Sequence, residues 1–92
     1  MNYRDTTTLT RSGRVATYLI DDETCLIDLQ TGDAFFLDGT GGAIWELLEE
    51  PITVGELVGR LAELYATSAE RISRDLGAYL ESLVSRGVIR TR

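Results

Sequence analysis

The spacing of apolar residues changes once along this chain, and that change limits the folds it can adopt. Between residues 15 and 37 the apolar residues fall in short β-branched and aromatic runs separated by polar turns, as expected for strands. From about residue 40 they recur every three or four positions, the period of a helix with one buried face. Strands followed by helices predict an α+β fold, a small sheet with helices on one face.

The first part of the chain predicts three strands. They cover residues 15–20, 24–29 and 34–37, with polar turns at 21–23 and 30–33. Gly32 is free to take a positive φ angle in the second turn. Such short connections join antiparallel neighbours, so we expect a three-stranded antiparallel sheet. Alternation in the last strand places Phe35 and Leu37 on one face and Phe36 on the other.

Three amphipathic helices are expected to follow the sheet. Thr40 is a candidate cap for the first helix, which runs to about Glu49, and Pro51 helps to end it. Thr53 and Glu56 have the T-x-x-E spacing of a capping box, in which each side chain accepts a backbone N–H of the other residue. The second helix therefore begins just after Thr53.

Thr67 and Glu70 repeat the T-x-x-E signal ahead of the third helix. Gly87 stands where a C-terminal cap belongs, because glycine adopts the left-handed conformation at low cost. Residues 88–89 then form either a short last strand or an extended tail. Residues 1–13 are polar and predict a flexible lead-in, which leaves residues 14–92 as a single domain.

The residue types do not favour catalysis. The chain has no histidine, which removes the usual general base and the commonest metal ligand. Cys25 lies inside a predicted strand and is interpreted as a small buried apolar group. The acidic residues 21–23 lack calcium-loop spacing, and the glycines at 39, 41 and 42 lack the lysine of a phosphate loop. We therefore expect a protein that is not an enzyme and holds no metal or cofactor.

Charge narrows the choice of partner. The net charge is −6, and the nine basic residues are scattered along the chain. Proteins that bind nucleic acid cluster basic residues against phosphates, so a basic or apolar peptide is a better candidate ligand. No stretch has the length of a membrane span or the form of a signal peptide, and one cysteine fits a reducing compartment. We expect a cytoplasmic protein with no membrane partner.

The predicted sheet suggests a binding mode. A three-stranded sheet has two edges, and the A-F-F-L strand at residues 34–37 is a candidate for one of them. An apolar edge is an aggregation hazard unless it is covered or used, and adding a peptide strand would use it. The alternative is that these side chains simply face the helical core.

The segment from Leu26 to Leu48, LIDLQTGDAFFLDGTGGAIWELL, resembles the signature stretch of the PqqD-like family of precursor-peptide recognition elements. The matching residues are Asp28, Thr31, Gly32, Phe35, Leu37, Thr40, Gly41, Ile44, Trp45, Leu47 and Leu48. The T-V-G-E-L-V helix and the closing R-G-V-I also match. The resemblance covers about residues 14–90, and the combined pattern is more specific than any part of it.

The resemblance implies a winged-helix-like fold of three strands and three helices. It also implies that the chain binds the leader segment of a ribosomally made precursor peptide as an added strand between the third strand and the third helix. The residues carried over as the strand edge are Ala34, Phe35, Phe36 and Leu37, and those on the helix are Ile72, Asp75, Leu76, Tyr79 and Leu83. Asp75 either pairs with a basic leader residue or is a solvated charge. Ile72, Leu76 and Leu83 are either groove or core residues.

Members of this family present the precursor to a tailoring enzyme or a leader peptidase, as in pyrroloquinoline quinone and lasso peptide synthesis. The chain departs from the family at Ala34, where tyrosine is common, and at Asp38, where asparagine is common. These departures favour a lasso-type or other peptide pathway. Two other readings are a winged-helix transcription-associated domain, which the acidic balance opposes, and a self-associating interaction domain.

Overall fold

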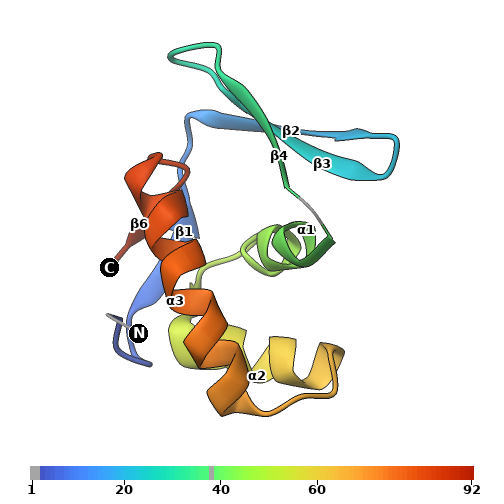
Figure 1. Ribbon diagram of the computed structural model, residues 1–92. Coiled ribbons are helices and arrows are strands. Elements are labelled where there is room, and N and C mark those ends of the chain that lie inside the picture. Colours follow the sequence, from blue (N-terminus) through green and yellow to red (C-terminus); the bar gives the residue numbers. More distant parts are fainter. Residues whose placement is uncertain (1–2, 38) are drawn as a thin grey trace.

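The fold combines two small antiparallel sheets with three helices, in a computed structural model that describes residues 3–37 and 39–92 (Figure 1). The strands are β1 (Thr8–Arg11), β2 (Val15–Ile20), β3 (Glu23–Asp28), β4 (Ala34–Leu37), β5 (Ile52–Thr53) and β6 (Ile89–Thr91). The helices are α1 (Gly39–Leu47), α2 (Val54–Leu64) and α3 (Ala69–Ser85). The α+β class and its helices are confirmed, and a second sheet is added to the expected one.

The expected antiparallel sheet is present, with strand order β2–β3–β4. Ile20 pairs with Glu23 across the two-residue turn at Asp21 and Asp22, whose φ angles are 50° and 66°. Positive φ at both central positions belongs to a type I′ turn, whose twist matches that of the flanking strands. Gly32 has a φ angle of 80° in the following turn, as expected.

The second sheet has the order β5–β1–β6 and takes in residues near both ends of the chain. Leu9 of β1 is fully buried in the core, opposite Thr91 of β6. The prediction of a flexible lead-in over residues 1–13 is therefore wrong for β1, because the core includes Leu9 and both neighbouring strands bond to β1. Residues 88–89 were expected to form either a short last strand or an extended tail, and the structure has a strand that begins at Ile89.

The helix ends agree in part with the capping signals. Thr53 Oγ1 accepts the backbone N–H of Glu56 at 3.1 Å, and Glu56 Oε1 accepts that of Thr53 at 3.2 Å. The predicted capping box is thus confirmed. Its hydrogen bonds, led by the Thr53 backbone N–H, hold the pKa of Glu56 below its usual value. Gly87 follows α3 with a φ angle of 75°, also as predicted.

Two predicted caps are wrong. Helix α1 begins at Gly39, so Thr40 lies within its first turn rather than before it. Helix α3 is capped by Ser68, whose hydroxyl accepts the backbone N–H of Arg71 at 3.2 Å, so Thr67 lies one residue too early. A hydroxyl caps a helix only from the last residue before it, and two adjacent hydroxyls leave that position ambiguous in the sequence.

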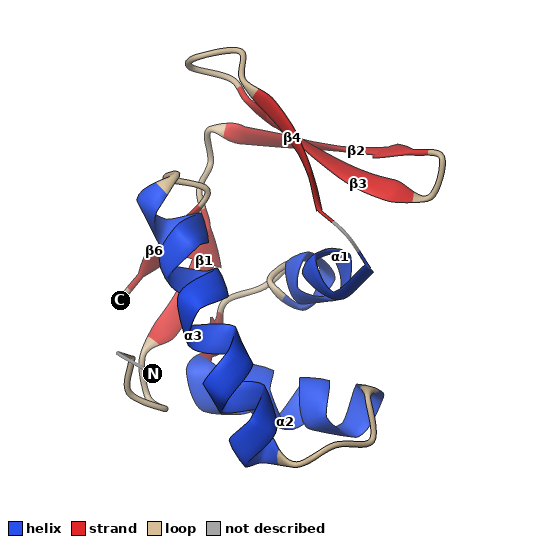
Figure 2. Ribbon diagram, in the orientation of Figure 1, coloured by secondary structure: helices blue, strands red, loops and turns tan. Residues whose placement is uncertain are grey.

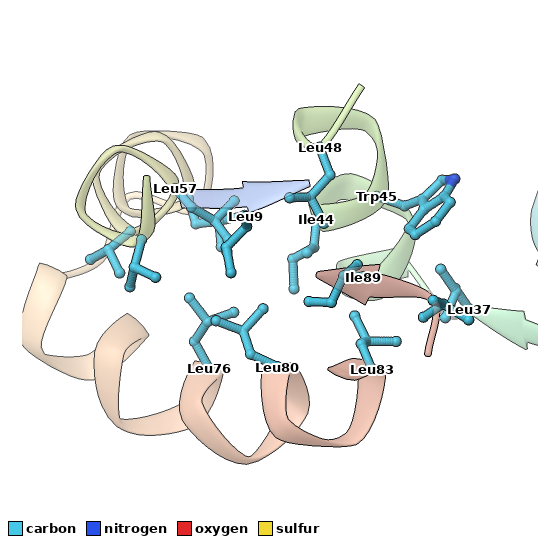
Figure 3. Close-up of a cluster of buried hydrophobic side chains, with 14 of the residues drawn as sticks. Leu9, Leu37, Ile44, Trp45, Leu48, Leu57, Leu76, Leu80, Leu83 and Ile89 are labelled. Atoms are coloured by element: carbon cyan, nitrogen blue, oxygen red, sulfur yellow. The ribbon is translucent and has the colours of Figure 1, made fainter. Parts of the chain in front are cut away.

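The core lies between the helices and both sheets. Leu76, Leu80 and Leu83 point from α3 toward side chains of the other elements, with Leu37 near one end (Figure 3). The buried cluster consists of Leu9, Leu26, Leu37, Ile44, Trp45, Leu48, Val54, Leu57, Val58, Leu61, Leu76, Leu80, Leu83, Val88 and Ile89. All three helices and four of the strands contribute to this single core.

Trp45 of α1 links the two sheets. Its indole N–H donates to Thr17 Oγ1 of β2 at 2.9 Å. On the other side, the guanidinium carbon of Arg11 in β1 lies 4.4 Å from the ring centroid, and Arg11 also donates to the Trp45 carbonyl. One buried side chain on α1 therefore contacts both sheets, which fixes how they are placed relative to each other.

Candidate functional site

Strand β4 lies at an edge of its sheet, with β3 as its neighbour. Leu29 N–H bonds to the Arg14 carbonyl on the β2 side, and Asp28 N–H bonds to the Asp33 carbonyl on the β4 side. Successive residues of an antiparallel strand direct their N–H and C=O groups to opposite sides of the strand. Along β4, every second residue therefore faces β3, and the residues between them face away from it. The N–H and C=O groups of Ala34 and Phe36 therefore point to the free edge.

A network centred on Asp28 shapes the turn before β4. One carboxylate oxygen of Asp28 accepts the backbone N–H of Gln30 at 2.9 Å and that of Thr31 at 3.4 Å. The other accepts the guanidinium of Arg14 at 2.8 Å. Thr31 Oγ1 in turn accepts the backbone N–H of Asp33 at 3.2 Å. These bonds explain the D-x-x-T-G pattern, because each polar residue satisfies a backbone group of the turn.

The same network lowers the pKa of the Asp28 carboxyl. The main cause is the hydrogen bond from the Gln30 backbone, which favours the charged form, and the bond and charge of Arg14 act in the same direction. Partial desolvation of this buried carboxylate opposes the shift. The turn that positions β4 is therefore built around an ionised aspartate.

A groove separates β4 from α3. Its middle section is a hollow of about 150 Å³ between Phe35 and Leu37 on the strand and Tyr79 and Leu83 on the helix. The guanidinium carbon of Arg86, just after α3, lies 4.8 Å from the Phe35 ring centroid at one side of this hollow. The groove thus has an apolar floor and one cationic wall.

The groove continues in both directions along α3. Beyond Tyr79 it opens into a hollow of about 330 Å³ between α1, α2 and α3, which Asp75 also lines. Beyond Phe35 and Arg86 it meets a hollow of about 420 Å³ beside the β3–β4 turn, which Arg14 also lines. The shared residues make the three hollows one trough. Asp75 lies toward one end. The other end holds Arg86 and Asp33, together with Arg14 and Asp28, which form an ion pair with each other.

The nine predicted site residues all line this trough. Ala34, Phe35, Phe36 and Leu37 come from β4, and Ile72, Asp75, Leu76, Tyr79 and Leu83 come from α3. Leu76 and Leu83 are buried and belong to the core cluster, so they form the floor, whereas Ile72 and Tyr79 are half-buried walls. Asp75 is exposed and has no ion-pair partner among the described residues. Asp38, the second departure from the family pattern, lies outside the described residues.

A close approach between helices sets the position of Tyr79. Gly41 of α1 lies directly against this side chain, and a Cβ atom at Gly41 would overlap the Tyr79 hydroxyl oxygen and come within 3.2 Å of the Leu37 Cβ. Only glycine therefore allows Tyr79 to occupy its present place in the groove wall. This requirement explains the T-G pair at residues 40–41.

Comparison with known proteins agrees with this geometry. A family model described as "Coenzyme PQQ synthesis protein D (PqqD)" matches residues 23–89, most of the chain. The chain belongs to the PqqD family. The matched segment includes β3, β4 and all three helices, so it contains both walls of the groove. No significant match is found among curated protein sequences.

One solved structure extends the resemblance beyond the PqqD family model. It is described as "TbiB1 in Complex with the TbiA(beta) Leader Peptide" and is 36% identical in sequence. The alignment covers 88% of this chain and 94% of that one, with a TM-score of 0.80. The similarity therefore includes the overall arrangement of the elements as well as the family segment.

Sequence reasoning assigned no role in the groove to Arg14, Arg86 or Gly41 of this PqqD-family chain. Arg14 and Arg86 look like ordinary surface charges in the sequence, and only the turn of the chain after α3 brings Arg86 to Phe35. Gly41 was part of the family pattern, but its role depends on a contact between α1 and α3 that sequence spacing does not report. The sequence contained one signal for Arg86: this arginine directly precedes Gly87, the predicted C-terminal cap of the third helix.

Within residues 3–37 and 39–92, no group of three or more His, Cys, Asp or Glu side chains is placed to hold a metal ion. Cys25 is 3% exposed, as expected of a small buried side chain. No helix in this part of the chain is long and apolar enough to cross a membrane. The groove between β4 and α3 has a shape suited to binding an extended peptide.

Proposed function

We propose that this PqqD-family chain binds the leader segment of a ribosomally synthesised precursor peptide and does not itself catalyse a reaction. The observation that carries the proposal is the free edge of β4 beside an open groove whose other wall is α3. The leader adds as a strand next to β4, and some of its side chains enter the groove.

The edge supplies the backbone partners for such a strand. Ala34 and Phe36 each direct one N–H and one C=O outward, which gives four groups for the leader backbone. Alternate side chains of the added strand then point toward α3, where the hollow between Phe35, Tyr79 and Leu83 receives an apolar anchor. Backbone bonds provide affinity and this hollow provides selectivity.

The solved relative supports this proposal, because its description names a complex with a leader peptide and it matches nearly the full length of this chain. The charges that line the trough also favour one orientation of the leader within it. A leader with a basic residue toward Asp75 and an acidic residue toward Arg86 would pair with both ends. The bound leader is then delivered to a tailoring enzyme or leader peptidase of the same pathway, in the cytoplasm.

A binding titration tests the proposal. Labelled leader peptides from short open reading frames beside the gene are titrated with the purified protein while fluorescence anisotropy is followed. We expect saturable binding of one leader with a Kd between nanomolar and micromolar, about −12 to −8 kcal/mol. If a folded protein binds none of these leaders, the proposed function is wrong.

Proline scanning of the sheet edges tests the binding mode. Phe36→Pro removes an N–H that points to the free edge and leaves the β3–β4 bonds intact, so we expect about tenfold weaker leader binding. Leu19→Pro is the matched control, since it removes an outward N–H from β2, at the opposite edge of the same sheet. Phe36→Ala separates the ring from the backbone group. Equal affinities of the two proline variants would contradict strand addition at β4.

A further inference from the structure

One face of the β2–β3–β4 sheet is directed away from the core. Tyr18, Cys25 and Phe36 lie opposite one another in register, so their side chains share this face. The neighbouring residues Leu26 and Thr17 point to the other face, where Leu26 joins the core and Thr17 bonds to the α1 tryptophan. None of the described helices lies above this sheet in the view of Figure 2.

This outer face is unusually apolar for an uncovered surface. Tyr18 is 52% exposed, Ile20 46% and Phe36 56%. We call these three residues the outer-face patch. Cys25 is buried although it is not part of the core cluster, in keeping with its place between two aromatic residues of the patch. Exposed apolar residues gathered on one sheet face indicate a binding surface, whereas isolated ones do not.

The outer-face patch borders the proposed leader site. Phe36 belongs to the patch through its side chain and to the free edge through its backbone. A leader strand added to β4 extends the sheet, and those of its side chains that do not enter the groove lie on the same face as Phe36. A protein that docks on this face therefore meets the leader as well, once the leader is bound.

The charges around the patch indicate which kind of protein docks there. Residues 15–27, which include Tyr18, Ile20 and the strand beside them, contain three acidic residues and no basic one. Asp21, Asp22 and Glu23 stand exposed at the turn next to Ile20. A second copy of this chain would bring a second set of carboxylates to that rim, which is unfavourable. A partner with Lys or Arg around an apolar centre complements it.

From these observations we infer that the outer-face patch is the docking surface for the enzyme that processes the leader. That enzyme presents an apolar surface rimmed by basic residues. This inference rests on the proposed function, because it assigns the meeting surface of the same delivery step. Docking beside the edge places the enzyme next to a leader strand already bound to β4.

The test compares variants that change the patch with a matched pair outside it. Tyr18→Thr with Ile20→Thr removes two patch side chains and keeps strand-forming residues. Leu19→Thr with Leu64→Thr is the matched pair, because it removes two exposed apolar side chains that lie on the other face of the sheet and on α2. Asp21→Asn with Asp22→Asn removes rim charge, and asparagine tolerates the positive φ angles found there. Each maturation enzyme whose gene adjoins that of this chain is purified separately and used as the probe.

Leader affinity is measured first, by anisotropy, and enzyme binding to the leader-loaded protein second, by calorimetry. We expect the patch pair to keep leader affinity within about twofold and to weaken enzyme binding more than about tenfold, with the outside pair unchanged. The asparagine pair should weaken enzyme binding about threefold at low salt, with less effect at high salt.

The outcomes separate the two proposals. If the wild-type protein binds no leader, the proposed function fails. If it binds the leader but the patch pair binds the enzymes as the wild type does, or if no enzyme binds, only the docking surface is wrong. Sedimentation supplies the last comparison: a wild-type dimer that the patch pair converts to a monomer would make a second copy the occupant and overturn the inference.

Discussion

The guanidinium group of Arg86 lies against the ring of Phe35, with 4.8 Å between the guanidinium carbon and the ring centroid. Phe35 belongs to β4 and Arg86 follows α3, so this contact joins the two walls of the groove. It holds the ring that forms one side of the apolar hollow.

Arg86→Ala should weaken leader binding about two- to fivefold, because a cation–π contact at an exposed site contributes about 0.5–1 kcal/mol. Arg86→Lys should retain part of the effect. Arg90→Ala is the control, since Arg90 is an exposed arginine of β6 that does not line the hollow. Anisotropy titrations give the comparison, and equal losses in the two alanine variants would show that the Phe35 contact has no special role.

Gly41→Ala should displace Tyr79 and weaken leader binding about tenfold, because the added Cβ overlaps the tyrosine hydroxyl. Gly59→Ala is a matched change in another helix, with no atom within 4 Å of the added Cβ. It should leave leader binding unchanged and raise stability by about 0.5–1 kcal/mol, the helix preference of alanine over glycine. Similar effects of both variants on the leader titration would rule out the proposed role of Gly41.

Asp28→Asn should lower the melting temperature at pH 7 and matter less in acid. The folded-state pKa of Asp28 is lowered, so its stabilising effect is complete above the unfolded value of about 3.9 and is lost as the pH falls toward the lowered pKa. Thermal melts of both proteins from pH 7 to pH 3 check this. A difference between them that stays constant below about pH 4 would contradict the ionised role of Asp28.

Leu9→Ala should lower the free energy of unfolding by about 2–5 kcal/mol, because it leaves a cavity in the core. Leu64→Ala removes the same atoms from an exposed site and should cost less than about 0.5 kcal/mol. Urea unfolding followed by circular dichroism measures both. Comparable losses would mean that β1 contributes nothing to the folded core.

Much of the groove was predictable because its strand obeys a local rule. The alternation of A-F-F-L places Phe35 and Leu37 toward the helices and leaves Phe36 exposed, as the structure has it. The turn residues between β3 and β4 act through their nearest neighbours in sequence, so the sequence predicts their conformation as well. The helical period likewise identified the face of α3 that carries Leu76, Tyr79 and Leu83.

Other features depend on contacts between distant segments. β1 contains one buried apolar residue among polar ones, and its partners β5 and β6 are two and three residues long. Such short pairings leave no periodic signal, so the second sheet could not be predicted. Periodicity identifies the buried face of a helix but not how deeply each residue is buried. For this reason the sequence left open whether Leu76 and Leu83 are groove or core residues.

The pairing of β1 with β6 has an architectural consequence. Leu9 stands opposite Thr91, so the chain enters and leaves the domain at neighbouring points (Figure 1). Both points lie in the second sheet, whereas the free edge of β4 belongs to the first. Because the two ends are neighbours, the fold is suited to insertion into a surface loop of a larger protein. It is equally suited to circular permutation, in which the two ends are linked and new ends are made elsewhere. Neither change alters β4.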